Sequence, residues 1–377
     1  MSAWPGKYVI GLTGNIATGK SVVRRMLEHL GAYGIDADAL GHRAIAKGAP
    51  GYQPVLDMFG TWILGESGQI DRAKLARIVF LDPQALTQLE EVVHPLVGEA
   101  VDLLVRRSKQ RVIVLEAIKL LESDLRSRCD SIWVTSAPQA LQLSRLTKKR
   151  QLSEAVARQR ITAQSSQQLK INAADVIIRN EGGFEDTWQQ VLAAWQKIFP
   201  AAQLEILEEQ QAPSGELVVQ RAGPRQAGEI AAFITHNSGG RRAYQREDVM
   251  AAFGDKAYLL LKRDSKLLGL AGWQVENLVA RVNDLYLEAD LPHDEAFRVL
   301  TQEVERASKE LQCEIALFFL PKKYARRAQI LHSLGYQQRS PGSLNVRAWQ
   351  EAAKESMPTD TVMYFKQLRR DRVLRPV

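Results

Sequence analysis

The chain has 377 residues, of which 45% are hydrophobic and 25% are charged. This length is too great for one ordinary core, so we expect two domains of a soluble globular protein. No stretch approaches the ~18 apolar residues of a membrane span, and residues 1–7 lack the apolar core of a signal peptide. We therefore expect a cytoplasmic protein with no membrane partner.

The net charge of +7 suits a protein that handles polyanions, but much of the excess lies in residues 366–375, which also fit a solvated tail. No nucleic-acid partner is expected, and the oligomeric state is not predicted. Cys129 and Cys313 are far apart and lie outside any metal-binding spacing, so we expect two small core residues.

A phosphate-binding loop stands near the start of the sequence. Gly14, Gly19, Lys20 and Ser21 satisfy G-x-x-x-x-G-K-[ST] between a strand pattern and a helix pattern. The glycines allow successive N–H groups to turn around an anion at the start of a helix. Lys20 supplies charge for the β- and γ-phosphates, and the Ser21 hydroxyl is a ligand for Mg²⁺. The flanking patterns disfavour the alternative, a glycine-rich turn that matches by chance.

Two aspartates follow the next short apolar segment. Residues 31–38 are long enough for a second strand, whose period of two would place Asp36 and Asp38 on the same side. Ligands of a doubly wound sheet lie beyond the carboxyl ends of its strands, so we expect Asp38 to face the bound phosphates. For Asp36 a role as helix N-cap is an equally open alternative.

Helical patterns then dominate, over residues 52–59, 70–80 and 86–105. Pro95 is expected to interrupt or kink the third of these helices just after His94. We expect the three helices to form an insertion over the nucleotide site, where a second substrate could bind.

Three further strands are expected at 111–116, 131–135 and 174–182, with a closing helix over 184–199. Their alternation with helices predicts a parallel sheet with right-handed crossovers. Between them, residues 144–160 form a basic helix pair whose Arg145, Arg150 and Arg160 could close on a transferring phosphoryl group. The alternative is a solvated charged face.

These motifs, in this order, resemble those of dephospho-CoA kinases over the first half of the chain. The segments that carry the resemblance are 11–21, 35–38, 71–72 with 78–80, 94–96, 120–122, the arginine-rich residues 144–160 and 174–180. That family phosphorylates the ribose 3′-hydroxyl of dephospho-CoA with ATP, the last step of coenzyme A synthesis. Two departures stand out: Val22 follows the loop serine, and Lys119 replaces the proline of the family's Pro-Leu-Leu-Phe-Glu motif.

The resemblance implies a role for each matching position. Catalysis is assigned to Asp38, Lys20, Arg145 and Arg150, and Mg²⁺ to Ser21 and Asp38. The acceptor would meet Asp36, Arg72, His94 and Glu122. The residues expected to hold ATP are Gly14, Asn15, Ile16, Ala17, Thr18, Gly19, Lys20, Ser21, Arg150 and Asn180.

The second half of the sequence has a different pattern. Strands are expected at 217–221, 257–263, 267–273, 280–287, 314–320 and 361–365, and helices at 224–235, 296–311 and 325–334. This order, with Leu334-Gly335-Tyr336 after the last of these helices, resembles the GNAT acetyltransferase fold.

The resemblance fails where that family binds the pyrophosphate of acyl-CoA. The corresponding residues 288–297 have no glycine, one proline and four acids, which should repel a polyanion. We therefore expect a domain that has lost acetyl transfer and has a binding or regulatory role. The basic residues that could compensate are Lys322, Lys323, Arg326 and Arg327.

The expected architecture is an α/β P-loop kinase with a parallel sheet and a helical insertion and lid, followed by an α+β GNAT-like domain with a mostly antiparallel sheet. The expected boundaries are 1–203, a linker over 204–216, and 217–377. The expected function is ATP- and Mg²⁺-dependent phosphorylation of dephospho-CoA. Two alternatives stay open: another small-molecule kinase acting on nucleosides or nucleotides, and a switch module in which nucleotide occupancy regulates the second domain.

Overall fold

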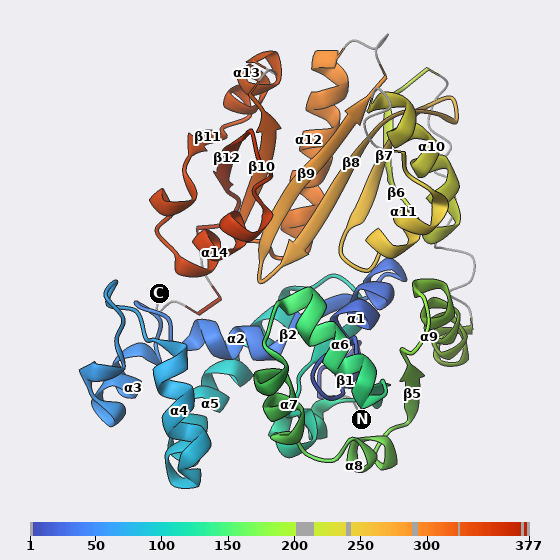
Figure 1. Ribbon diagram of the computed structural model, residues 1–377. Coiled ribbons are helices and arrows are strands. Elements are labelled where there is room, and N and C mark those ends of the chain that lie inside the picture. Colours follow the sequence, from blue (N-terminus) through green and yellow to red (C-terminus); the bar gives the residue numbers. More distant parts are fainter. Residues whose placement is uncertain are drawn as a thin grey trace.

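The computed structural model describes residues 3–200, 215–238, 243–288, 293–322, 325–370 and 373–374. Two sheets, each covered by its own helices, divide the described chain (Figure 1). We call residues 3–200 the N-terminal unit and the described residues from 215 onward the C-terminal unit. The expected linker lies almost entirely outside the described residues, so the boundaries proposed above stay predictions.

The N-terminal unit is built on a five-stranded parallel sheet in the order β2-β3-β1-β4-β5. Its apolar strands are buried on both faces, which is usual for parallel sheets and explains their continuous hydrophobic runs. Since all strands are parallel, their carboxyl ends meet at one edge. The strands are β1 (Tyr8–Thr13), β2 (Tyr33–Asp36), β3 (Val112–Glu116), β4 (Ser131–Ser136) and β5 (Val176–Arg179).

Helices cover both faces of this sheet. On one face α1 (Lys20–His29) and α9 (Phe184–Ile198) pack on Ile10, Leu12 and Val114. On the other face α2 (Ala37–Ala44) and α5 (Pro83–Arg107) pack on Ile113 and Leu115. The unit is therefore a three-layer α/β structure, as the sequence predicted.

Three groups of shorter elements complete the unit. The insertion consists of α3 (Tyr52–Phe59), η1 (Thr61–Ile63) and α4 (Arg72–Leu81) beside α5, and it projects at the lower left of Figure 1. The arginine-rich segment forms α6 (Gln139–Arg150) and α7 (Glu154–Thr162), and α8 (Gln167–Asn172) follows. Two short turns, η2 (Leu120–Glu122) and η3 (Asp124–Arg128), follow β3.

Two local expectations are wrong. The second strand ends at Asp36, whose side chain accepts a hydrogen bond from the Ala39 amide as the N-cap of α2. Asp38 therefore lies in the first turn of a helix and not on a strand with Asp36. In addition, the interruption expected at Pro95 is wrong: α5 continues through this proline, and Val97, Val101 and Leu104 beyond it are buried in the core, while the alternative of a kink stays a prediction.

The C-terminal unit has a seven-stranded sheet in the order β11-β12-β10-β9-β8-β7-β6. All neighbours pair antiparallel except β9 and β10, so the expectation of a mostly antiparallel sheet is confirmed. The strands are β6 (Val218–Arg221), β7 (Ala257–Arg263), β8 (Lys266–Glu276), β9 (Val279–Leu287), β10 (Ile315–Pro321), β11 (Gln337–Arg339) and β12 (Thr361–Gln367).

Two helices of this unit, α11 and α14, were not predicted from the sequence. The buried face of α14 consists only of Trp349, Ala352 and Ala353, which is too few apolar residues to give a clear helical periodicity. The helical elements are η5 (Pro224–Gln226), α10 (Ala227–Asn237), α11 (Arg246–Ala252), α12 (His293–Glu310), α13 (Ala325–Ser333), η6 (Pro341–Ser343) and α14 (Arg347–Ser356).

Both cysteines are free, as expected: Cys313 is buried in the core of the C-terminal unit, and Cys129 packs against the N-terminal core. Within the described ranges, none of the helices combines the length and the apolar character needed to cross a membrane.

Candidate active site

The loop between β1 and α1 depends on its two glycines. Gly14 and Gly19 have φ values of +149° and +97°, which favour glycine. A Cβ at Gly19 would lie 1.8 Å from Asn180 Nδ2, and one at Gly14 would lie 2.5 Å from the Thr135 carbonyl oxygen. No side chain other than hydrogen fits at either position.

The start of α1 is open to an anion. Gly19 is its N-cap and supplies no side-chain acceptor, so the amides of the first turn lack partners inside the helix. Lys20 is buried, and its ammonium group donates to the carbonyl oxygens of Gly14 (3.1 Å) and Asn15 (3.3 Å). Burial lowers the pKa of Lys20, and the nearby carboxylates of Glu116, Asp38 and Asp36 offset part of that change. The loop thus gathers N–H groups and one ammonium around a single space.

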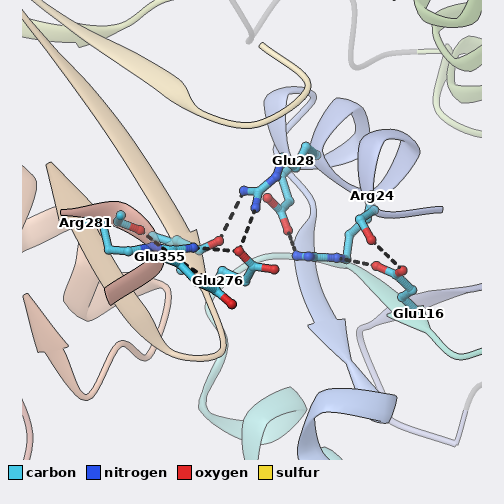
Figure 2. Close-up of polar contacts among 10 residues, drawn as sticks. Arg24, Glu28, Glu116, Glu276, Arg281 and Glu355 are labelled. Atoms are coloured by element: carbon cyan, nitrogen blue, oxygen red, sulfur yellow. Dashed lines mark hydrogen bonds and ion pairs between the residues drawn. The ribbon is translucent and has the colours of Figure 1, made fainter. Parts of the chain in front are cut away.

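A carboxylate at the end of β3 organises the next turn of α1. Glu116 accepts a hydrogen bond from the Ser21 hydroxyl at 2.9 Å and, through its other oxygen, one from Arg24 Nε at 2.7 Å. Arg24 also donates to Glu28 at 2.6 Å, and the three charged side chains form the right-hand part of Figure 2. This network fixes the rotamer of Ser21.

Asp38, in the first turn of α2, lies close enough to Lys20 for the two charges to act on each other. Its carboxylate accepts a hydrogen bond from the Ile118 amide at 3.1 Å. Burial raises the pKa of Asp38, while the Lys20 ammonium and the Ile118 amide pull it down. Burial and the neighbouring Glu116 carboxylate raise the pKa of Asp36 to about 6. Both carboxylates therefore lie close enough to Lys20 and Glu116 to act on them electrostatically, but Asp36 also caps α2 whereas Asp38 does not.

Arg145 and Asn180 form hydrogen bonds with the backbone of the phosphate loop. Arg145 donates to the carbonyl oxygens of Ala17 (3.1 Å) and Asn180 (2.9 Å). Asn180 Nδ2 donates to the carbonyl oxygen of Thr18 at 3.0 Å, and the Thr18 hydroxyl bonds Thr135 at 2.7 Å. Arg145 and Asn180 thus contact the backbone of the phosphate loop directly.

Side chains from the α7–α8 connection and from the first residue of α8 contact the first part of the loop. Gln167 accepts a hydrogen bond from the Asn15 amide at 3.1 Å, and Gln164 accepts one from the Ile16 amide at 2.7 Å. Asn15 also donates from its side chain to the carbonyl oxygen of Ser165 at 3.0 Å. Two backbone amides of the phosphate loop are therefore already paired with glutamine side chains.

Comparison with known proteins shows the family to which this chain belongs. The family model described as dephospho-CoA kinase matches residues 8–186. The dephospho-CoA kinase of Geobacter metallireducens is 40% identical over 192 residues, which are 50% of this chain and 96% of that protein. The chain belongs to the dephospho-CoA kinase family.

Solved structures resemble each unit. TT1252 from Thermus thermophilus is 30% identical and similar over 51% of this chain and 98% of its own, with a TM-score of 0.47. A second similarity, to the PaiA N-acetyltransferase from Thermoplasma acidophilum in complex with coenzyme A, covers 40% of this chain and 99% of that one at 12% identity, with a TM-score of 0.32.

The remaining residues implied by the kinase family lie farther from the loop. Glu122 accepts a hydrogen bond from Ser165 at 3.2 Å, beside the glutamine segment. Arg150 is exposed at the end of α6, yet close enough for its charge to act on Lys20. Arg72, at the start of α4, and His94, in α5, are exposed, and Arg72 lines a cavity of about 160 Å³ between α2 and α14.

Four further residues at the site were missed from the sequence. Glu116 is the acidic end of an otherwise apolar strand next to β1, a signal that could have been used. Gln164 and Gln167 lie in a polar run with no distinguishing pattern. Lys170 is buried and donates to the Ile118 carbonyl oxygen at 2.7 Å, next to the amide that holds Asp38. Its contact depends on long-range packing.

The side-chain oxygens of Ser21, Glu116, Asp36 and Asp38 are of the kind that binds Mg²⁺, an ion that the phosphates of a nucleotide would also hold. Ser21 and Glu116 are hydrogen-bonded, and the Asp36 and Asp38 carboxylates act electrostatically on the same lysine. Among the described residues, no group of three or more His, Cys, Asp or Glu side chains could hold a metal alone. Mg²⁺ in kinases needs only one or two protein ligands besides the phosphates and water.

Residues 288–297, whose acids are expected to repel pyrophosphate, lie partly outside the described residues. Of the four acids, Glu288 directly follows β9, Asp294 and Glu295 stand in the first turn of α12, and Asp290 lies outside the described residues. Among the four basic candidates, Lys323 lies outside the described residues.

Proposed function

We propose that this chain transfers the γ-phosphoryl group of ATP to the ribose 3′-hydroxyl of dephospho-CoA. The proposal rests on the phosphate loop with its buried Lys20, and on the Asp38 carboxylate of α2, which accepts the Ile118 amide and lies close enough for its charge to act on Lys20. The family resemblance of residues 8–186 supplies the substrates. The loop amides and Lys20 bind the phosphates, and α1 places the positive end of its dipole beside them.

Asp38 is the proposed general base. In-line transfer requires the acceptor hydroxyl to be oriented and to lose its proton as the new P–O bond forms. The Ile118 amide fixes the Asp38 carboxylate, and the hydroxyl proton passes to that carboxylate. Arg145 holds the loop backbone, and the exposed Arg150 is free to approach the phosphates and stabilise charge during transfer.

Mg²⁺ is the proposed metal, with Ser21, Glu116 and Asp38 as the residues that would hold it directly or through water. When bound, it neutralises phosphate charge and orients the γ-phosphoryl group. In the protein itself, Glu116 accepts a hydrogen bond from the Ser21 hydroxyl, so the lone pairs of the Ser21 oxygen would remain available to the metal.

The acceptor assignment is tested by ADP release in the presence of dephospho-CoA, nucleosides and nucleoside monophosphates. We expect turnover only with dephospho-CoA, and a product that carries the 3′-phosphate by mass and phosphorus NMR. Turnover with a nucleotide instead would replace the acceptor. Nucleotide binding with no acceptor-dependent turnover would favour the switch module.

Lys20→Ala provides the matched test of the site. We expect loss of most phosphoryl transfer with the fold intact, because Lys20 contacts loop carbonyls and no part of the apolar core. Circular dichroism checks the fold. Turnover close to wild type would contradict the assignment of the loop.

For the C-terminal unit we propose a binding or regulatory role without acetyl transfer. The acids at Glu288, Asp294 and Glu295 support this proposal because they disfavour a bound pyrophosphate. Incubation of the full chain with acetyl-CoA and a panel of amines should give no acetylated product. Acetylation of any amine above background would contradict it.

A further inference from the structure

The C-terminal unit holds the two helices that begin at the catalytic groups. The turn between β8 and β9 (residues 277–278) packs Leu278 against the N-terminal core. On α1, Arg25 donates to the Val275 carbonyl oxygen at 3.1 Å. On α2, Arg43 donates to the Asn277 carbonyl oxygen at 2.8 Å. One hairpin of the second unit therefore contacts both α1, which starts at Lys20, and α2, which carries Asp38.

Two adjacent arginines on α1 point to opposite partners. The side chains of Arg24 and Arg25 are only 6% and 9% exposed, so each buried cation needs an anion close by. Arg24 has Glu28 and Glu116, both in the N-terminal unit. Arg25 has Glu276 of the C-terminal unit at 3.9 Å. Figure 2 shows Glu276 on the opposite side of Glu28 from the Arg24–Glu116 pair.

Glu28 is within reach of both arginines. It is four residues after Arg24 and three after Arg25, the two spacings at which helical side chains meet. Glu28 and Arg25 also line the same small cavity, together with Arg221. The charge of Glu28 therefore acts on Arg25 and Arg221 as well as on Arg24. Arg24 has Glu116 as its second carboxylate, and Arg25 has Glu276.

Glu276 is itself held in place. Arg281 donates to its carboxylate at 2.6 Å and to the Ser356 hydroxyl at 2.8 Å. Burial alone would raise the pKa of Glu276, but the Arg281 and Arg25 cations more than offset that effect and lower it. The carboxylate is therefore charged at neutral pH and available to Arg25.

We propose that Glu276 is a positioning residue for phosphoryl transfer: by pairing with Arg25 it reserves Glu28 for Arg24, which keeps Arg24 on Glu116 and Glu116 on Ser21. This inference rests on the proposed function, since Ser21 matters only if a nucleotide and its metal bind there. Without the charge of Glu276, Arg25 turns to Glu28, Arg24 shares its partner, and the rotamer of Ser21 is no longer fixed. The second unit is then part of the kinase active site.

The test compares Glu276→Gln with wild type in the ADP-release assay with dephospho-CoA. We expect kcat to fall about 2- to 30-fold, the range for residues that act through a network, with KM for dephospho-CoA unchanged. The matched control is Glu355→Gln, which removes the exposed carboxylate on the other side of Arg281, 3.9 Å away, and should leave kcat unchanged. Equal loss in both variants would assign the effect to Arg281 and overturn the proposal.

The decisive variant combines Glu276→Gln with Arg25→Met. If Glu276 acts by occupying Arg25, removal of Arg25 makes Glu276 dispensable, and the double variant should have the kcat of Arg25→Met alone. A double variant slower than Arg25→Met alone overturns the proposal, as does a Glu276→Gln variant with wild-type kcat. This comparison also decides the matter where Glu276→Gln alone does not fold. Absence of turnover in the wild-type enzyme would instead refute the proposed function, so the two failures are distinct.

Discussion

Asp36 and Asp38 are two residues apart, yet the structure gives them different surroundings. Asp36 caps α2 by accepting the Ala39 amide, while Asp38 is oriented by Ile118 and acts electrostatically on Lys20. The sequence pattern predicted that both aspartates lie on a strand, because the preceding segment is apolar. A helix N-cap was left open as an alternative for Asp36, and the structure confirms that alternative. Helix α2 starts at Ala37, so Asp36 lies at the end of β2 and Asp38 lies in the first turn of the helix.

Asp38→Asn should therefore cost far more activity than Asp36→Asn. Removal of a general base commonly lowers the rate by about 10²–10⁴, whereas asparagine caps a helix as well as aspartate does. The measurement is kcat for both purified variants with ATP and dephospho-CoA. A larger loss in Asp36→Asn would show that the wrong aspartate had been chosen.

The same residue sets an expectation for pH. Burial raises the pKa of Asp38, and a base must be unprotonated to accept the hydroxyl proton. We therefore expect kcat/KM of the wild-type enzyme to decline on acidification at a pH above that of an ordinary aspartate. The Asp38→Asn variant, measured over the same pH range, should lack this decline.

Among the elements, those whose signals are local were predicted well. The phosphate loop, α1 and the parallel strands follow from residues within ten positions of each other. Contacts such as Ser21 with Glu116, 95 residues apart, depend on the register of β1 with β3 and were not predicted. The connection between α7 and α8 is another case, since nothing in its polar sequence indicates that it covers the loop.

The α7–α8 connection yields a prediction on nucleotide affinity. Gln164 accepts a hydrogen bond from the Ile16 amide, an N–H group that would otherwise be able to donate to a bound phosphate. Gln164→Ala removes this competitor, so we expect the Kd for ATP to fall by about 2- to 10-fold, the equivalent of one hydrogen bond. Isothermal titration without acceptor measures it.

The matched control is Gln168→Ala, because Gln168 is exposed and its side chain donates to Asn172 of the same helix at 2.8 Å. Its Kd for ATP should equal that of wild type. A weaker affinity in Gln164→Ala would instead mean that this glutamine contacts the bound nucleotide.

For the whole molecule, the fold class of each half could be predicted but the joint between them could not. Alternating strands and helices indicate a parallel sheet, and residues 280–287 were predicted as a strand that the structure extends by one residue to Val279–Leu287. The partners of Arg25 and Arg43 lie more than 200 residues away, on a surface that exists only once both units have folded. No local pattern distinguishes these arginines from ordinary charged residues of an exposed helix face.

This joint contains a buried ion pair, which gives a prediction for stability. Arg43 pairs with Glu314, whose side chain is fully buried and also accepts a hydrogen bond from Trp349 Nε1 at 3.0 Å. Arg43→Met should lower the free energy of unfolding by about 3–5 kcal/mol, because it leaves a buried carboxylate unpaired. The double variant Arg43→Met with Glu314→Gln should recover most of the loss, since glutamine carries no charge and still accepts a hydrogen bond from Trp349.

Glu154→Gln, which breaks an exposed pair with Arg158, serves as control and should lower the free energy of unfolding by less than about 1 kcal/mol. Urea denaturation of the four proteins measures these differences. If Arg43→Met were no less stable than Glu154→Gln, the two units would not depend on this pair, and the hairpin of the C-terminal unit would have to be held against the kinase helices by its apolar contacts alone.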